Sequence, residues 1–114
     1  MEKELRVGVF GVWRGSAYMN VINYLDRIRV TAVCDKNPAR IEAAKKYVPE
    51  GTPTFDNFDD FIESGLFDAV VLCNYFNEHA DFAIRCLEKG LHVFSETMAA
   101  STMADCVRLC RAVE

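Results

Sequence analysis

Residues 5–35 place the tightest constraint on the fold, because strand, glycine turn, helix, strand and acid follow one another there. The segment 5–10 reads Leu-Arg-Val-Gly-Val-Phe, which is typical of a strand buried on both faces. It runs into Gly11, and a predicted helix over 16–25 and a second strand over 28–34 lead to Asp35. In a dinucleotide-binding unit, such a turn directs backbone N–H groups at a phosphate and the acid accepts from a ribose hydroxyl.

The glycine turn departs from the usual fingerprint. Gly-x-Gly-x-x-Gly would start at Gly11, but Trp13 stands at the second glycine and Ser16 at the third. Trp13 either plugs the phosphate site, forms a lid that stacks on a ligand, or turns outward, and the sequence leaves these three alternatives open.

Strands and helices alternate along the rest of the chain. Asn37 is a natural N-cap, with Pro38 at the first helical position, and Asn57 caps a later short helix. The expected order is helix 38–47, strand 54–55, helix 58–63, strand 68–73, helix 77–88, strand 91–95, and a last helix from Ser101 or Thr102. Alternation with short connections requires right-handed crossovers and a parallel sheet. We therefore predict a doubly wound, Rossmann-type α/β fold with strand order 3-2-1-4-5 and helices on both faces.

Three of the predicted helices show one apolar face. These faces are Tyr18, Val21, Ile22 and Leu25; Ala80, Ala83, Ile84 and Leu87; and Met103, Cys106, Val107 and Cys110. A sixth strand would normally follow and is not seen, so we expect the N-terminal piece of a longer protein that lacks a substrate domain. We also expect an exposed apolar edge, through which the domain could form a homo-oligomer.

Composition narrows the classes of partner. The 114 residues suit one domain, and a net charge of −4 without a basic cluster argues against nucleic acid. No apolar run approaches the ~20 residues of a membrane span. The cysteines are odd in number at five and form no CxxC pair, which predicts a reducing cytoplasm and no metal site.

Two segments of the second half carry a family resemblance. One is Asp68–Cys73 with His79 six residues later, and the other is Gly90, His92-Val93 and Glu96. With Gly8, Gly11 and Asp35 in the first half, the whole chain resembles the glucose–fructose oxidoreductase / inositol dehydrogenase / MocA (Gfo/Idh/MocA) family. In that family one strand ends in Ala-Thr-Pro-Asn, with a histidine three residues further on. A later strand has Gly-Lys-His-Val followed by Glu-Lys-Pro.

The resemblance implies a set of residues around the phosphates and the adenosine ribose. Gly11 matches the first fingerprint glycine, Trp13 and Arg14 lie in the same turn, and Gly15 and Ser16 fall where a small residue lets the helix approach the strand. Asp35 matches the acid that accepts from the ribose hydroxyls; the alternative is an acid held by the dipole of the second helix. An acid there favours NAD, since it repels a 2′-phosphate, whereas Lys36 and Arg40 could serve NADP.

The resemblance also implies the residues on the nicotinamide side. Cys73, Asn74 and Tyr75 occupy the place of Ala-Thr-Pro-Asn; Tyr75 and Phe76 either contact a flat ring or shield the strand ends. His79 is either a neutral hydrogen-bonding group or structural. Glu96 matches the acid of Glu-Lys-Pro. Thr97 replaces the family's proton-handling lysine, and its hydroxyl lacks a pKa usable near neutral pH.

The sequence thus predicts the NAD(P)-binding domain of an oxidoreductase that acts on a sugar or polyol through a second domain. No catalytic residue is assigned, and the 114-residue chain alone is not expected to turn over. Two alternatives stay open: a cofactor-binding or sensory pseudoenzyme, and a lyase or hydrolase that uses bound NAD transiently.

Overall fold

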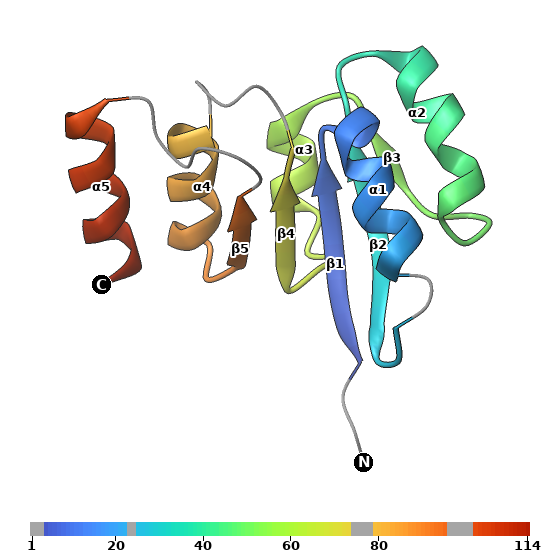
Figure 1. Cartoon of the computed structure of the whole chain (residues 1–114), viewed down its shortest axis with the longest axis horizontal. Coiled ribbons are helices and arrows are strands. Elements are labelled where there is room, and N and C mark those ends of the chain that lie inside the picture. The colour runs from blue at the N-terminus through green and yellow to red at the C-terminus, as the bar shows by residue number, and fades with distance from the viewer. Residues whose placement is uncertain (1–3, 23–24, 74–78, 96–101) are drawn as a thin grey trace.

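A five-stranded parallel sheet forms the centre of the computed structural model, which describes residues 4–22, 25–73, 79–95 and 102–114 (Figure 1). The strands are β1 (Leu5–Phe10), β2 (Ile28–Cys34), β3 (Thr54–Phe55), β4 (Ala69–Leu72) and β5 (His92–Ser95). Their order is β3-β2-β1-β4-β5, and every pairing is parallel, which confirms the predicted topology.

Helices cover both faces of the sheet, as a doubly wound fold requires. They are α1 (Val12–Ile22), α2 (Pro38–Ala44) continued by the 3-10 turn η1 (Lys45–Tyr47), α3 (Phe58–Glu63), α4 (His79–Glu88) and α5 (Met103–Val113). Val12 and Met19 of α1 and Ala44 of α2 are buried with Val9 and Val33 on one face. The other face buries a second cluster, to which α3 contributes Phe58 and Phe61 and α4 contributes Ala83 and Cys86.

The predicted caps begin α2, α3 and α5. The Asn37 side chain accepts from the N–H of Ala39, with Pro38 in the first turn, and the Asn57 side chain accepts from the N–H of Asp59. Thr102 caps α5 by accepting from the N–H of Asp105. These local side chains satisfy N–H groups that a helix start leaves without an internal acceptor.

The first helix was placed wrongly by the sequence pattern. It begins at Val12 rather than Ser16 and ends at Ile22 before Leu25. Its buried side therefore contains Val12 and Met19, while Val21 is 57% and Leu25 48% exposed. The shift arises because Gly11, with φ +88°, turns the chain directly from the strand into the helix.

The last helix packs beside α4 at the edge of the molecule and has no buried residue (Figure 1). Of its predicted apolar face, Met103 is 79% and Val107 43% exposed, and Cys106 and Cys110 are exposed. Phe94, on the neighbouring strand β5, is 55% exposed. The Phe94 ring contacts Tyr18 of α1 on one face of the sheet, whereas Leu109 of α5 packs against the cluster on the other face. The exposed apolar docking edge expected from the sequence, and self-association through it, stay predictions.

Within the described residues, no helix has both the length and the apolar character that a membrane crossing needs.

Candidate functional site at the carboxyl ends of the strands

The carboxyl end of β1 passes into α1 through Gly11. Its N–H donates to the carbonyl of Cys34 on β2 at 2.9 Å, and its carbonyl accepts from the N–H of Gly15 at 3.0 Å. That second bond is the first of the helix, so Gly11 is the N-cap of α1. A glycine has no side chain with which to cap the helix.

Asp35, the next residue after β2, supplies the missing cap. Its Oδ2 accepts from the N–H of Val12 at 3.1 Å, and its Oδ1 accepts from the N–H of Asn37 at 2.9 Å. The side chain is buried, at 7% exposed. Because each carboxylate oxygen has two lone pairs, both oxygens keep one acceptor position beyond these bonds.

The start of α1 therefore presents two backbone N–H groups that the helix itself does not use. The N–H groups of Gly11 and Val12 already have partners in Cys34 and Asp35. The next two N–H groups, those of Trp13 and Arg14, have no acceptor inside the helix, since the first intrahelical bond is the one from Gly15. Such donors, at the positive end of the helix dipole, suit a phosphate.

Gly15 lets α1 lie close against the sheet. A Cβ built at this position would lie 2.5 Å from Cγ1 of Val9, closer than packed atoms approach. The small residue expected here is therefore required by the contact between α1 and β1. Ser16 lies one residue further along α1, beyond the first-turn donors.

The other predicted residues fall at the same edge of the sheet or outside the described chain. Lys36 is exposed beside Asp35, and Arg40 is half-buried in α2. Cys73 is buried directly after β4, where its N–H donates to the carbonyl of Phe10 at 2.8 Å. His79 is the first residue of α4. Outside the described residues lie Asn74, Tyr75, Phe76, Glu96 and Thr97, and the side chains of Trp13, Arg14 and His79.

Cys34 and Cys86 have thiols that stay protonated near neutral pH. Burial, and secondarily the charge of Asp35, raises the pKa of Cys34 to about 12. Burial likewise raises the pKa of Cys86 to about 12. A nucleophilic or metal-binding role requires the thiolate, so these cysteines act as small apolar core residues. The described part of the chain also brings together no group of three His, Cys, Asp or Glu side chains suited to a metal.

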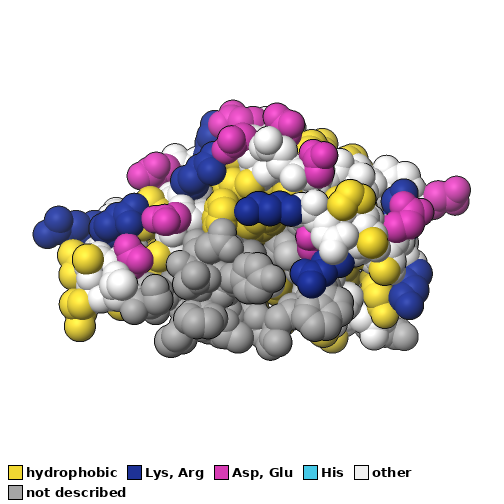
Figure 2. Space-filling view, turned by 90° about the horizontal axis from the view of Figure 1, so that it is seen from above, with side chains coloured by type: hydrophobic (Ala, Val, Ile, Leu, Met, Phe, Trp, Pro, Cys, Tyr) yellow, Lys and Arg dark blue, Asp and Glu magenta, His cyan; other side chains and the backbone are white. Residues whose placement is uncertain are grey.

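Seen from the carboxyl ends of the strands, the described surface carries acidic and basic side chains side by side (Figure 2). This face therefore shows no field of a single sign over its described part.

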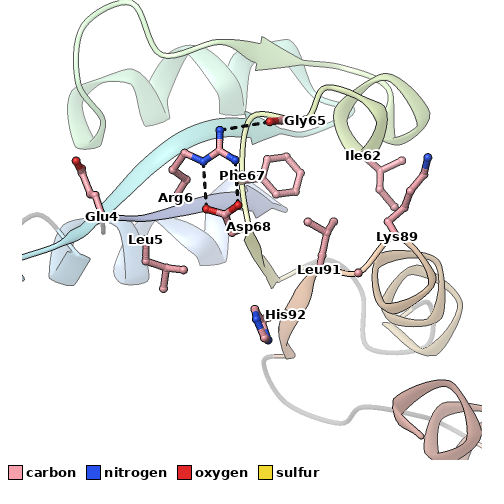
Figure 3. A pocket seen from close by; sticks show the side chains of 11 residues that line it. Glu4, Leu5, Arg6, Ile62, Gly65, Phe67, Asp68, Lys89, Leu91 and His92 are labelled. Atoms are coloured by element: carbon pink, nitrogen blue, oxygen red, sulfur yellow. Dashed lines mark hydrogen bonds and ion pairs between the residues drawn. The ribbon is translucent and has the colours of Figure 1, made fainter. Parts of the chain in front are cut away.

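An open cavity of about 670 Å³ lies at the opposite, amino end of the sheet (Figure 3). Arg6 and Asp68 face one another in it, with Nε to Oδ2 at 3.1 Å and Nη2 to Oδ1 at 2.9 Å. The Asp68 carboxylate raises the pKa of the Arg6 guanidinium. Apolar side chains of Leu5, Phe67 and Leu91 complete much of the lining. This facing acid and base satisfy each other, and the other charged lining residues, Glu4 and Lys89, pair with Arg29 and Glu63.

Sequence reasoning missed Val12 as part of the site. Its contribution is a backbone N–H, which carries no residue signature, and its partner Asp35 is 23 residues away. The only indirect indication in the sequence is that a glycine, which has no capping side chain, stands at the start of the helix.

Comparison with known proteins shows the family to which the chain belongs. The model for the oxidoreductase family Gfo/Idh/MocA, NAD-binding Rossmann fold, matches residues 5–114. Inositol 2-dehydrogenase of Salmonella typhimurium is 32% identical over 111 residues, which cover 95% of this chain and 33% of that protein. The glycosyl hydrolase family 109 protein 2 of Phocaeicola vulgatus is 32% identical over 113 residues, 92% of this chain and 27% of that protein.

Among solved structures, the WlbA dehydrogenase from Bordetella pertussis, in complex with NADH and UDP-GlcNAcA, superimposes with a TM-score of 0.88 at 29% identity. The match covers 97% of this chain and 34% of that one. The chain thus spans between about a quarter and a third of the length of these relatives. It belongs to the Gfo/Idh/MocA oxidoreductase family, in which it corresponds to the NAD-binding Rossmann fold.

Proposed function

We propose that this chain binds NAD(H) at the carboxyl ends of β1, β2 and β4, as the cofactor domain of an oxidoreductase that acts on a sugar or polyol. The observation that carries the proposal is the bond between Asp35 and the N–H of Val12. It brings a carboxylate suited to a ribose diol next to a helix start suited to a phosphate. The residues present therefore fit a dinucleotide.

The assignment of individual contacts follows from this arrangement. The N–H groups of Trp13 and Arg14 would bind the pyrophosphate, and Asp35 would accept from the adenosine ribose hydroxyls. NAD is preferred to NADP because a 2′-phosphate would meet a buried carboxylate that two backbone bonds hold in place. Lys36 and Arg40 lie at the rim of the same site and are the groups that would soften this preference.

A titration tests the proposal. The chain is titrated with NADH and, separately, NADPH by calorimetry and by nucleotide fluorescence. We expect binding of NADH with a weaker response to NADPH, and a loss of at least about tenfold in NADH affinity in Asp35→Ala, as befits a hydrogen bond to a charged group. Asp68→Ala is the matched control, since it removes a carboxylate at the other end of the same sheet. No heat and no fluorescence change up to millimolar NADH and NADPH would contradict the proposal.

The chemistry that the cofactor would serve is a second proposal. NAD at this site would supply hydride transfer to or from a substrate carbon, and the protein would then have to handle the proton of the hydroxyl on that carbon. A base positioned for this proton is worth about 10²–10⁴ in rate. Thr97 stands where the family pattern has lysine, so we propose that this segment moves no proton and that the base belongs to another part of the protein.

Paired substitutions at Thr97 test this in the full-length protein. With a panel of sugars and polyols, Thr97→Ala should leave turnover within a few-fold of the original, and Thr97→Lys reports whether a base at this position adds to the rate. Loss of a robust activity in Thr97→Ala, with unchanged NADH affinity, would show that Thr97 is catalytic.

A second candidate function is favoured by one comparison. A relative at 32% identity is named as a glycosyl hydrolase rather than a dehydrogenase. A hydrolase or lyase that oxidises and then reduces its substrate again would need the same cofactor site. Release of a leaving group from a glycoside without net formation of NADH distinguishes it from a dehydrogenase.

A further inference from the structure

The start of α1 differs from the starts of α2, α3 and α5. Those three helices are capped by Asn37, Asn57 and Thr102, each of which precedes its own helix. Helix α1 has Gly11 in that position and is capped instead by Asp35, which lies 23 residues after Val12, the residue from whose N–H it accepts. The helix whose start is proposed to bind a phosphate is thus held there by a side chain from the end of β2.

The geometry of the carboxylate makes this cap stiff. Asp35 is 7% exposed, and its second oxygen accepts from the N–H of Asn37 at 2.9 Å. Rotation of the carboxylate would break both bonds at once. Hydrogen bonds from backbone N–H groups to a buried carboxylate are among the stronger ones in proteins, because the acceptor is charged.

We infer that Asp35 is a positioning residue for the phosphate-binding turn as well as a ribose ligand. By fixing the N–H of Val12, it sets the direction of the two N–H groups that follow, those of Trp13 and Arg14. The inference rests on the proposed function, in which those two groups bind the pyrophosphate. The proposed function assigns Asp35 only to the ribose. The inference adds that the affinity for phosphate also depends on Asp35.

The two roles predict opposite responses to an anion that has no ribose. If Asp35 acted only on the ribose, its removal would leave the affinity for inorganic pyrophosphate unchanged or raise it, since a nearby negative charge is lost. If Asp35 positions the turn, removal frees the first turn of α1 and lowers that affinity although a repelling charge has gone.

The experiment measures binding of inorganic pyrophosphate to ¹⁵N-labelled chain, from the amide shifts of Trp13 and Arg14. Asp35→Ala is compared with Asn37→Ala, which removes the side-chain cap of α2 but keeps the backbone N–H bound to Asp35. We expect at least a fivefold weaker affinity in Asp35→Ala and a change of less than twofold in Asn37→Ala. An unchanged or higher affinity in Asp35→Ala would overturn the inference.

Amide hydrogen exchange gives a second readout that needs no ligand. The N–H groups of Val12 and Gly15 should exchange at least about tenfold faster in Asp35→Ala than in the original chain or in Asn37→Ala. Asp35→Asn keeps the side-chain volume and one acceptor oxygen, so its exchange rates should lie between those of the original chain and of Asp35→Ala. It replaces Asp35→Ala in the experiment if the alanine variant does not fold. If the N–H of Val12 exchanges at the original rate in Asp35→Ala or in Asp35→Asn, the inference is overturned. If neither pyrophosphate nor NADH binds the original chain, the proposed function fails, and the exchange data alone decide whether Asp35 anchors α1.

Discussion

The two ends of the sheet each contain an aspartate, one bonded to a donor from β1 and the other to the first residue of α1, but in different surroundings. At the amino end, Asp68 is 34% exposed in its side chain and pairs with a guanidinium, Arg6, that is itself 42% exposed. At the carboxyl end, Asp35 is 7% exposed and binds backbone N–H groups. Arg6 and Asp68 are opposite charges that neutralise each other. Among the described residues Asp35 has only backbone N–H partners and therefore keeps its negative charge.

The difference teaches that a cavity and a binding site need not coincide. The amino end has the open cavity of about 670 Å³, yet Arg6 and Asp68 satisfy one another there. The carboxyl end is identified by chemistry instead: an acceptor with spare lone pairs and a helix start with N–H groups that the helix does not use. Substitutions at both ends can break or sharpen this comparison.

The largest effect is expected at Gly15, on the carboxyl side. Gly15→Val places atoms where even a Cβ would lie 2.5 Å from Cγ1 of Val9, so α1 must move off the strand. Overpacking of this kind costs about 3 kcal/mol in the free energy of unfolding. Urea denaturation measures the loss, and NADH affinity should fall with it. A variant as stable as the original chain would show that the contact between α1 and β1 is not tight.

The next effect is a dependence of stability on alkaline pH. The folded pKa of Cys34 and of Cys86 is raised to about 12, above the ordinary value of 9.0. The protonated thiols therefore stabilise the fold fully below pH 9, and that contribution is lost as pH rises from 9 towards 12. Each thiol contributes a slope of at most about 1.4 kcal/mol per pH unit. Denaturation at pH 8 to 10.5 checks this, and Cys86→Ala should reduce the slope.

Thiol labelling separates the same cysteines from those of α5. At pH 8 a thiol reagent should modify the exposed Cys106 and Cys110 rapidly, and should reach Cys34 and Cys86 only after unfolding. Rapid labelling of Cys34 in the folded chain would show that the end of β2, next to Asp35, is not closely packed.

A smaller effect is expected for the ion pair at the amino end. Asp68→Ala removes the partner of Arg6, but both side chains are partly exposed, so the cost is about 1 kcal/mol or less. NADH affinity should stay within twofold of the original, since the cavity is at the far end from the proposed site. A large loss of affinity would show that the two ends are coupled and that the comparison fails.

The smallest effect concerns Arg27, also at the amino end. Its φ of +66° lies in the left-handed region, which costs a residue with a side chain more than it costs glycine. Arg27→Gly should be more stable than Arg27→Ala by about 0.5–1 kcal/mol. Comparing these two variants removes the contribution of the arginine side chain itself. Equal stabilities would mean that the turn relaxes without cost.

Strand order was predictable because the sequence alternates strongly apolar segments with capped helices. Strands β1, β2 and β3 and helix α3 have the predicted bounds. At β4 the prediction was one residue too long on each side, yet Asp68 still continues the ladder, with its N–H bound to Arg6 and its carbonyl to His92. Local pattern suffices where neighbouring residues determine the structure.

The start of α1 was not predictable in the same way. A glycine-rich segment ahead of an apolar stripe indicates a loop through Ser16, whereas the helix begins at Val12 because Asp35 caps it from β2. That bond joins residues far apart in the sequence, so no local pattern contains it. The predicted roles of Gly11, Gly15 and Asp35 at the cofactor stay predictions, although all three residues lie at the carboxyl edge of the sheet.

The central position of β1 also sets the order in which the sheet can be completed during synthesis. Val7–Phe10 of β1 pair on one side with β2 and on the other with Ala69–Leu72 of β4. Of these five strands, the first to leave the ribosome is therefore the middle of the sheet. It can pair early with β2, to whose far edge β3 adds, but the other edge of β1 stays open until β4 has emerged. A ribosome that pauses in this interval leaves an apolar strand edge available to a neighbouring nascent chain, and unpaired strand edges are prone to pair with other chains.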